Sequence, residues 1–264
     1  MSVEISQAGP VVTITINRPQ ARNAVDPATA AALMAAFAGA ERDDGVLAMV
    51  LTGAGGAFCA GADLKAVGEG AAFEHAAHGP MGPSRLLSDR AEAEPGVSLS
   101  KPLIAAVEGP AVAGGLELAL LADLRVASAT AVFGVYCRRW GVPLIDGGTV
   151  RLPRIVGQGR ALDMILTGRA VAAEEAYAWG LANRLTPAGE ALATAQALAA
   201  DIARFPQVCM RGDRASAFAG WSLSLDAALR AEGARGRAAL AAEAQDGARR
   251  FAGGLGRGGD FSEI

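Results

Sequence analysis

A glycine pair and a carboxylate stand where a strand passes into a helix, and their types and spacing suit acid–base chemistry. The apolar run 103–107 has the length of a strand, and the leucine-rich stretch after Gly115 has the pattern of a buried helix. Gly114 and Gly115 permit close backbone approach and unusual backbone angles, and the first N–H groups of a helix have no intrahelical partner. These amides could hold an oxyanion, with Glu117 in the first helical turn as the acid or base. The same pattern also fits tight structural packing, with Glu117 complementing the helix dipole.

A second glycine-rich turn follows the strand-like run 48–52 and ends at Ala62 and Asp63. It would present the backbone N–H of Ala62, with Lys65 as a nearby cation and Asp63 as the N-cap of the next helix. An enolate oxygen requires paired N–H donors, and one such donor contributes about 3 kcal/mol of transition-state stabilisation in other enzymes. The amides of Ala62 and Gly114 are therefore predicted to form an oxyanion hole.

Several motifs along the chain share one order and spacing with a known family. They cover residues 17–24, 60–64, 114–119, 133–134, 147–153, 166–169 and 173–180. Together they resemble the crotonase (enoyl-CoA hydratase/isomerase) superfamily over about residues 3–252. In that family such motifs mark a site for a coenzyme A thioester and an oxyanion hole rather than a single reaction.

The resemblance implies an α/β fold, a crotonase-like spiral of ββα units closed by a C-terminal helical trimerisation region. We expect the spiral core in residues 1–200 and the helical region in residues 201–264. The assembly that the resemblance implies is a homotrimer or a dimer of trimers.

Local patterns supply elements for such a fold. Residues 11–16 alternate like a half-buried strand, and Asp26 and Pro27 suit the N-cap and the first position of a helix. The last long stretch with a helical pattern is 223–251. Residues 66–100 are rich in Gly, Pro, Ser and charged side chains, and in the family the corresponding region flanks the acyl pocket.

The resemblance also assigns residues to the coenzyme A part of the substrate. The turn with Arg22 and Ala24 is similar to the family loop whose backbone receives the adenine, and Arg22 adds a planar cation that can reach a phosphate. Ala60 and Lys65 match substrate-binding positions, and Phe251 matches an aromatic near the adenine, sometimes that of a neighbouring subunit. The alternative is that Arg22 and Lys65 are solvated cations and Phe251 is a core aromatic.

One position departs from the family pattern. A hydratase of this family uses one glutamate after the glycine pair and a second four residues after the Phe of the Phe-Gly motif. Counting forward from Phe133 gives Cys137, and the spacing to the next glycine pair is ungapped, so a thiol replaces the second glutamate. A neutral thiol, with an ordinary pKa of about 8.5, does not replace a carboxylate without retuning. This departure weakens the prediction of hydration by the two-glutamate route.

Other residues could supply the missing group. Asp146 precedes a glycine pair in a loop that lines the active site in the family, although Asp also suits a turn at this place. Cys137 could act as an acid or nucleophile or be an inert buried thiol, and Tyr136 could donate a hydrogen bond to the substrate. His75 and His78, the only histidines, could enter the pocket as bases or remain exposed.

We therefore expect a CoA-thioester-processing enzyme that stabilises an enolate between the amides of Ala62 and Gly114. The first expectation is an enoyl-CoA hydratase-like lyase, with Glu117 moving a proton or orienting water and Asp146 as its partner. An enoyl-CoA isomerase with one base is the alternative, followed by thioester hydrolysis or decarboxylation. A non-catalytic acyl-CoA-binding protein is an alternative of another class, but such a protein gains little from a carboxylate that costs desolvation.

Composition sets the broader limits. The chain has 264 residues, of which 52% are hydrophobic, and its net charge of −3 argues against a nucleic-acid partner. Its three cysteines, an odd and widely spaced set, indicate a reducing compartment rather than a disulfide framework. The N-terminus lacks the pattern of a signal peptide, and no apolar run reaches the roughly 18–20 residues of a membrane span. We expect a cytoplasmic protein with no membrane partner, no metal, and no cofactor beyond the coenzyme A of its acyl-CoA substrate.

Overall fold

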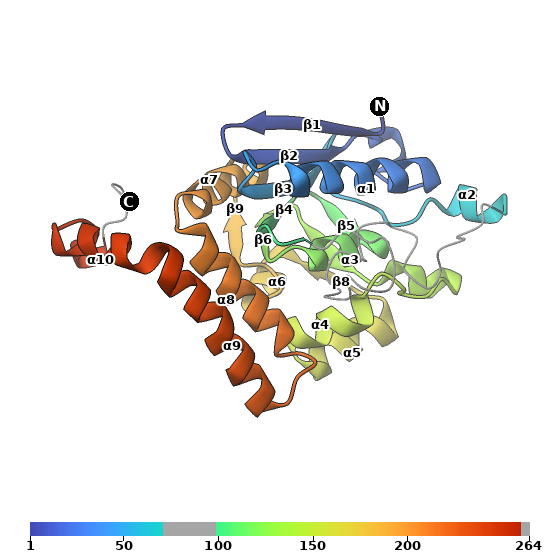
Figure 1. The fold of residues 1–264 in the computed structure, drawn as a ribbon. Helices are drawn as coiled ribbons and strands as arrows, with labels where there is room; N and C mark the ends of the chain where they lie inside the picture. Colours follow the sequence, from blue (N-terminus) through green and yellow to red (C-terminus); the bar gives the residue numbers. More distant parts are fainter. Residues whose placement is uncertain (71–98, 260–264) are drawn as a thin grey trace. The chain divides into compact units, whose positions relative to one another are not determined.

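A six-stranded sheet runs through the first of two compact units, which comprise residues 1–200 and 201–264. The computed structural model describes residues 1–70 and 99–259. The strand order is β1-β2-β3-β4-β6-β9, in which the β1–β2 pair is antiparallel and the other pairs are parallel (Figure 1). The strands are β1 (Val3–Ala8), β2 (Val11–Ile16), β3 (Ala48–Gly53), β4 (Leu103–Val107), β6 (Leu124–Ser128) and β9 (Arg184–Thr186).

A second sheet of three strands leads into the glycine-pair motif. β5 (Pro110–Val112) pairs in parallel with β7 (Val132–Gly134), and β7 pairs in antiparallel with β8 (Ala170–Ala172). After β5 the chain enters α3 (Gly114–Leu121), and after β7 it forms the 3-10 turn Tyr136–Trp140. Because β5 and β7 are neighbours, the segments that carry Glu117 and Cys137 begin side by side.

Burial on both faces explains the continuous apolar sequences of the central strands. Every residue of β4 and the first five residues of β3 are buried, as is typical of parallel strands covered on both sides. α1 (Pro27–Arg42) packs on β1 and β2 and buries Phe37 completely, a burial that contributes about 2–3 kcal/mol. Asp26 caps α1, accepting a hydrogen bond from the Thr29 amide at 2.8 Å, as the sequence predicts.

Short helices complete the first unit. They are α2 (Leu64–Gly68), α4 (Gly148–Val156), α5 (Gln158–Thr167), α6 (Ala173–Ala178) and α7 (Ala191–Ala203), of which α7 crosses the boundary between the two units. Asp63 caps α2 as predicted, accepting from the Lys65 amide. α3 packs against α4, so the first turns of both helices contribute to one site.

The second unit is helical, as the pattern of residues 223–251 predicts. It contains α8 (Gln207–Ala219), α9 (Leu225–Ala239), a π-helical turn at Leu240–Ala244 and α10 (Gln245–Ala252). α8 packs against α9, and the Glu243 carboxylate accepts hydrogen bonds from the first amides of α8. Within residues 1–70 and 99–259, the helices are too short or too polar for any of them to span a bilayer.

Candidate active site

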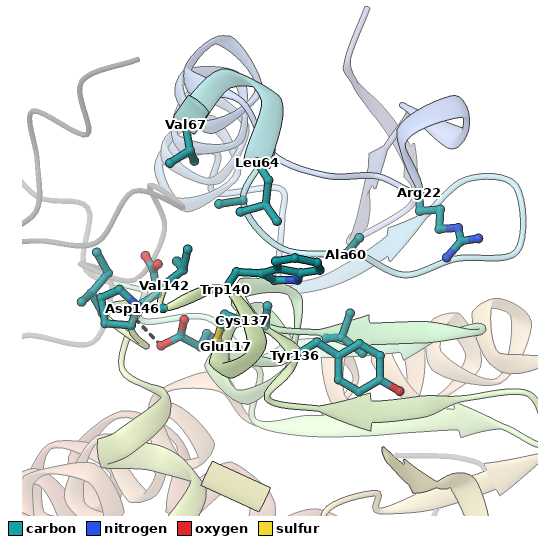
Figure 2. Close-up of a pocket in the computed structure, with 17 residues that line it drawn as sticks. Arg22, Ala60, Leu64, Val67, Glu117, Tyr136, Cys137, Trp140, Val142 and Asp146 are labelled. Carbon is teal, nitrogen blue, oxygen red and sulfur yellow. Dashed lines mark hydrogen bonds between the residues drawn. The ribbon is translucent and has the colours of Figure 1, made fainter. Parts of the chain in front are cut away.

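A cavity of about 390 Å³ opens in the first unit, between the two glycine-rich turns and the loop after β7. Glu117 and Asp146 lie close together in it, and Arg22 lies on the opposite side of the view (Figure 2). Trp140 and Cys137 lie between those two groups (Figure 2). In this view the two carboxylates are therefore gathered on one side of the cavity.

Backbone amides from two turns meet at this cavity. Ala62 and Gly114 both line it, and a Cβ placed on Gly61 would lie only 2.8 Å from the Gly114 nitrogen, so the two turns are in direct contact. Within residues 1–70 and 99–259, neither the Ala62 nor the Gly114 amide donates a backbone hydrogen bond. Two N–H groups thus remain for an acceptor supplied by a ligand.

The residue with unusual backbone angles before α3 is Ala113 rather than either glycine of the pair. Neither Gly114 nor Gly115 has a positive φ, whereas Ala113 has φ +54° and ψ −126° just before α3. Such angles strain a residue that carries a Cβ. Gly115 is needed for close approach instead, since a Cβ there would lie 2.0 Å from the carbonyl oxygen of Cys59. Neither glycine therefore adopts the positive φ that glycine permits, whereas Gly115 does allow the close approach.

Glu117 is clamped by main-chain amides. Its Oε1 accepts hydrogen bonds from the Asp146 amide at 2.9 Å and the Gly148 amide at 2.8 Å, and the residue is 2% exposed. Burial, and then the negative charge of Asp146, raise the pKa of Glu117 to about 7, although both amides and the Arg151 guanidinium lower it. Glu117 is therefore poised to gain or lose a proton near neutral pH.

Asp146 is buried beside Glu117 and lines the same cavity. It is 3% exposed and precedes Gly147, which adopts φ +94° at the N-cap of α4. Arg151, one turn into α4, donates from Nη1 to the Asp146 carbonyl oxygen at 2.8 Å. Asp146 thus lies in the predicted turn and also lines the cavity.

The thiol at the position of the second family glutamate is buried and neutral. Cys137 lines the cavity, and burial, followed by the charge of Glu117, raises the pKa of its thiol. Tyr136 also lines the cavity, and the Arg139 guanidinium stacks 4.4 Å from the centre of its ring. A raised pKa makes Cys137 a weak nucleophile and a poor replacement for a carboxylate.

Apolar side chains form much of the remaining wall, and local sequence patterns do not identify them. Trp140 lines the cavity and is 69% exposed, so much of its surface is available to a ligand. Leu64 and Val67 of α2 and Val142 after the 3-10 turn also line it. These residues come from segments that meet only in the folded chain. Of the four, only Trp140 has a side chain whose type suggests ligand binding.

The residues predicted to bind coenzyme A are not all brought together. Arg22, which has φ +51°, and Ala60 line the cavity, whereas Lys65 is an exposed residue of α2 outside the lining. Ala24 is buried, and its amide donates to the Ala21 carbonyl rather than facing the cavity. Phe251 is 62% exposed in the second unit.

Two further predictions concern histidines and metals. His75 and His78 lie outside the described residues. Among residues 1–70 and 99–259, no group of three or more His, Cys, Asp or Glu side chains could hold a metal ion.

Comparison with known proteins places this chain in a family. The model of the family described as enoyl-CoA hydratase/isomerase matches residues 6–252. The enoyl-CoA hydratase EchA19 of Mycobacterium tuberculosis is 40% identical over 198 residues, covering 74% of this chain and 72% of that protein. A carnitinyl-CoA dehydratase of Salmonella arizonae is 40% identical over 199 residues, covering 75% and 73%. The crystal structure of an enoyl-CoA hydratase from Mycobacterium tuberculosis matches with a TM-score of 0.85 and 35% identity over 95% of each chain. This chain belongs to the enoyl-CoA hydratase/isomerase family.

Proposed function

We propose that the protein is an enoyl-CoA hydratase-like lyase that adds water across the double bond of a 2-enoyl-CoA. The observation that carries the proposal is the burial of two carboxyl groups, those of Glu117 and Asp146, at one cavity with two backbone amides. Similarity to a hydratase and to a dehydratase supports it, because hydration and dehydration are the two directions of one reaction.

The two amides act on the thioester. With the carbonyl oxygen between the N–H groups of Ala62 and Gly114, the charge that develops as water attacks Cβ is stabilised as an enolate. These donors are fixed before the reaction by the contact between the two turns, so they need no reorganisation as charge develops. Their effect is greatest inside a cavity from which water is largely excluded.

The carboxyl pair carries the protons. As the oxygen of water bonds to Cβ, one carboxylate takes a proton from that water, and the other carboxyl group supplies a proton to Cα. Two neighbouring buried carboxyls resist simultaneous ionisation, which favours one acid and one base in the same site. A pKa of about 7 for Glu117 fits this division at neutral pH, and Asp146 replaces the family glutamate whose position Cys137 occupies.

The family resemblance and the free cysteines support proposals for the substrate contacts, the assembly and the cellular compartment. Coenzyme A enters as part of the substrate, with Arg22 and Ala60 at the cavity and Lys65 as a further contact. Phe251 is proposed to lie near the adenine of a coenzyme A bound by a neighbouring subunit. We infer a homotrimer or a dimer of trimers, assembled through the helical region 201–264, with residues 1–200 as the spiral core. Three free cysteines support a reducing, cytoplasmic environment.

Incubation of the full chain with crotonyl-CoA in ¹⁸O-labelled water tests the proposal. We expect loss of the enoyl absorbance together with one ¹⁸O atom at C3 of the product. Glu117→Gln should abolish this reaction while the affinity for coenzyme A changes little. Movement of the double bond without ¹⁸O would identify an isomerase, and release of free thiol a hydrolase. Binding without turnover across several acyl chain lengths would identify an acyl-CoA-binding protein, and any of these three outcomes would contradict the proposal.

A further inference from the structure

A buried guanidinium lies directly behind the carboxyl pair. Arg151 is 6% exposed on α4, and its Nη1 donates to the Asp146 carbonyl oxygen at 2.8 Å. A Cβ on Gly147 would lie 2.5 Å from the same Nη1 atom, so the guanidinium packs against the turn itself. Arg151 therefore holds the main chain of the turn at residues 146–148 through a hydrogen bond and a packing contact.

The turn that Arg151 fixes is the one that holds Glu117. The amides of Asp146 and Gly148 both donate to Oε1 of Glu117, and a Cβ on Gly148 would lie 2.9 Å from the Cγ of Glu117. A shift of the turn would move both donors and the Asp146 side chain together. Arg151 is thus linked to both carboxyl groups through the turn at residues 146–148.

Arg151 also places a positive charge beside the pair, because it interacts electrostatically with both Glu117 and Asp146. Among residues 1–70 and 99–259, the charges of Asp146 and Arg151 act on Glu117. The charge of Glu117 in turn acts on Cys137, and that of Asp146 acts on Cys59. Burial raises the pKa of both thiols, so they stay neutral near pH 7. Burial lowers the pKa of Arg151, and the two carboxylates raise it, which keeps the guanidinium charged.

We infer that Arg151 is a positioning residue that holds the 146–148 turn against Glu117 and balances the charge of the carboxyl pair. The inference rests on the proposed function, because the proposed function assigns the acid–base roles to Asp146 and Glu117. It assigns to Arg151 no contact with the substrate. Geometry and charge are separable in this role, because lysine keeps the charge and loses the planar guanidinium that reaches the carbonyl.

Two substitutions and a matched control test the inference in the full chain. Arg151→Gln removes charge and geometry, Arg151→Lys removes geometry alone, and Arg154→Gln removes an exposed arginine of the same helix whose Nη1 donates to the Val150 carbonyl. The readouts are kcat and KM for crotonyl-CoA hydration, and the titration midpoint of Glu117. Infrared difference spectra against Glu117→Gln give that midpoint without any turnover.

We expect Arg151→Gln to lower kcat by about 100-fold with little change in KM, and to move the Glu117 midpoint above its wild-type value of about 7. Arg151→Lys should lower kcat and leave the midpoint near the wild-type value, and Arg154→Gln should change neither. If Arg151→Gln folds with an unshifted midpoint, or if kcat falls only with the folded fraction, Arg151 is merely structural and the inference fails. If the wild-type protein adds no water to the substrate, the proposed function is overturned instead. The titration midpoint of Glu117 needs no turnover, so it still tests whether Arg151 acts on Glu117.

Discussion

Asp146 acts on Glu117 in two opposing ways. Its backbone amide donates to Oε1 of Glu117 at 2.9 Å, which lowers the pKa of that carboxyl group. Its own negative charge raises the same pKa, and burial raises it more. One residue thus helps to orient Glu117 and, together with burial, keeps its pKa near neutral pH.

Replacement of Asp146 by Asn separates these two effects. Asp146→Asn keeps the backbone donor and removes the charge, so the Glu117 midpoint should fall below about 7 while the orientation of Glu117 is kept. Loss of the second acid–base group should lower kcat by about 100-fold or more. Steady-state kinetics across pH measure both effects. The exposed Asp44→Asn variant serves as the charge-matched control, and near-normal turnover by Asp146→Asn would remove Asp146 from the mechanism.

A methyl group at Gly148 should displace Glu117. The added Cβ would lie 2.9 Å from both Cγ and Oε1 of Glu117, closer than such atoms pack. We expect Gly148→Ala to lower kcat by about 100-fold and to reduce the free energy of unfolding. Gly159→Ala on α5 meets no atom within 4 Å, so it should preserve activity and stabilise the helix by about 0.5–1 kcal/mol. Kinetics and denaturant unfolding compare the two variants, and equal behaviour would refute the steric argument.

The raised pKa of Glu117 makes stability depend on pH. Between its ordinary pKa of 4.5 and its folded value of about 7, the folded protein binds a proton that the unfolded chain has released. The free energy of unfolding should therefore fall as pH rises through this window, by on the order of 3 kcal/mol from this group. Urea unfolding of wild type and Glu117→Gln at several pH values isolates the effect. The difference in the free energy of unfolding between the two proteins should change by that amount between pH 4.5 and about 7. A difference that stays constant with pH would argue against a raised pKa of Glu117.

The Cys137 thiol should be dispensable. Because its pKa is raised, it is neutral at working pH and is a weak acid and a weak nucleophile. Cys137→Ala should therefore lower kcat by less than about tenfold, well short of the loss expected for a general acid or base. A larger loss in a variant with unchanged circular dichroism and thermal unfolding would place the thiol in the mechanism.

Local sequence signals predict the parts of the fold that depend on neighbouring residues. The N-cap at Asp26, the strand at 103–107 and the helix that begins beside Glu117 all appear in the structure where the sequence places them. Each depends on capping, on apolar runs or on glycine, which act over a few residues. The architecture as a whole was predicted from the resemblance to a family rather than from these signals.

The site is harder to predict because its contacts join distant segments. The approach of Asp146 to Glu117 depends on the packing of α4 on α3, and the role of Arg151 depends on the turn before its own helix. Trp140 lines the cavity only because the loop after β7 returns toward α2. Residue types in one stretch do not encode such proximity.

The two amides that we propose as thioester donors are main-chain atoms, and this divides the site into a part that is free to vary and a part that is not. Replacing the side chain of Ala62 leaves its N–H in place, whereas glycine is required at positions 61 and 115 by the close approach of the two turns. The wall formed by Leu64, Val67 and Trp140 carries no such restriction. Substitutions in this wall can therefore change which acyl groups are accepted during evolution, while the two backbone amides stay in place.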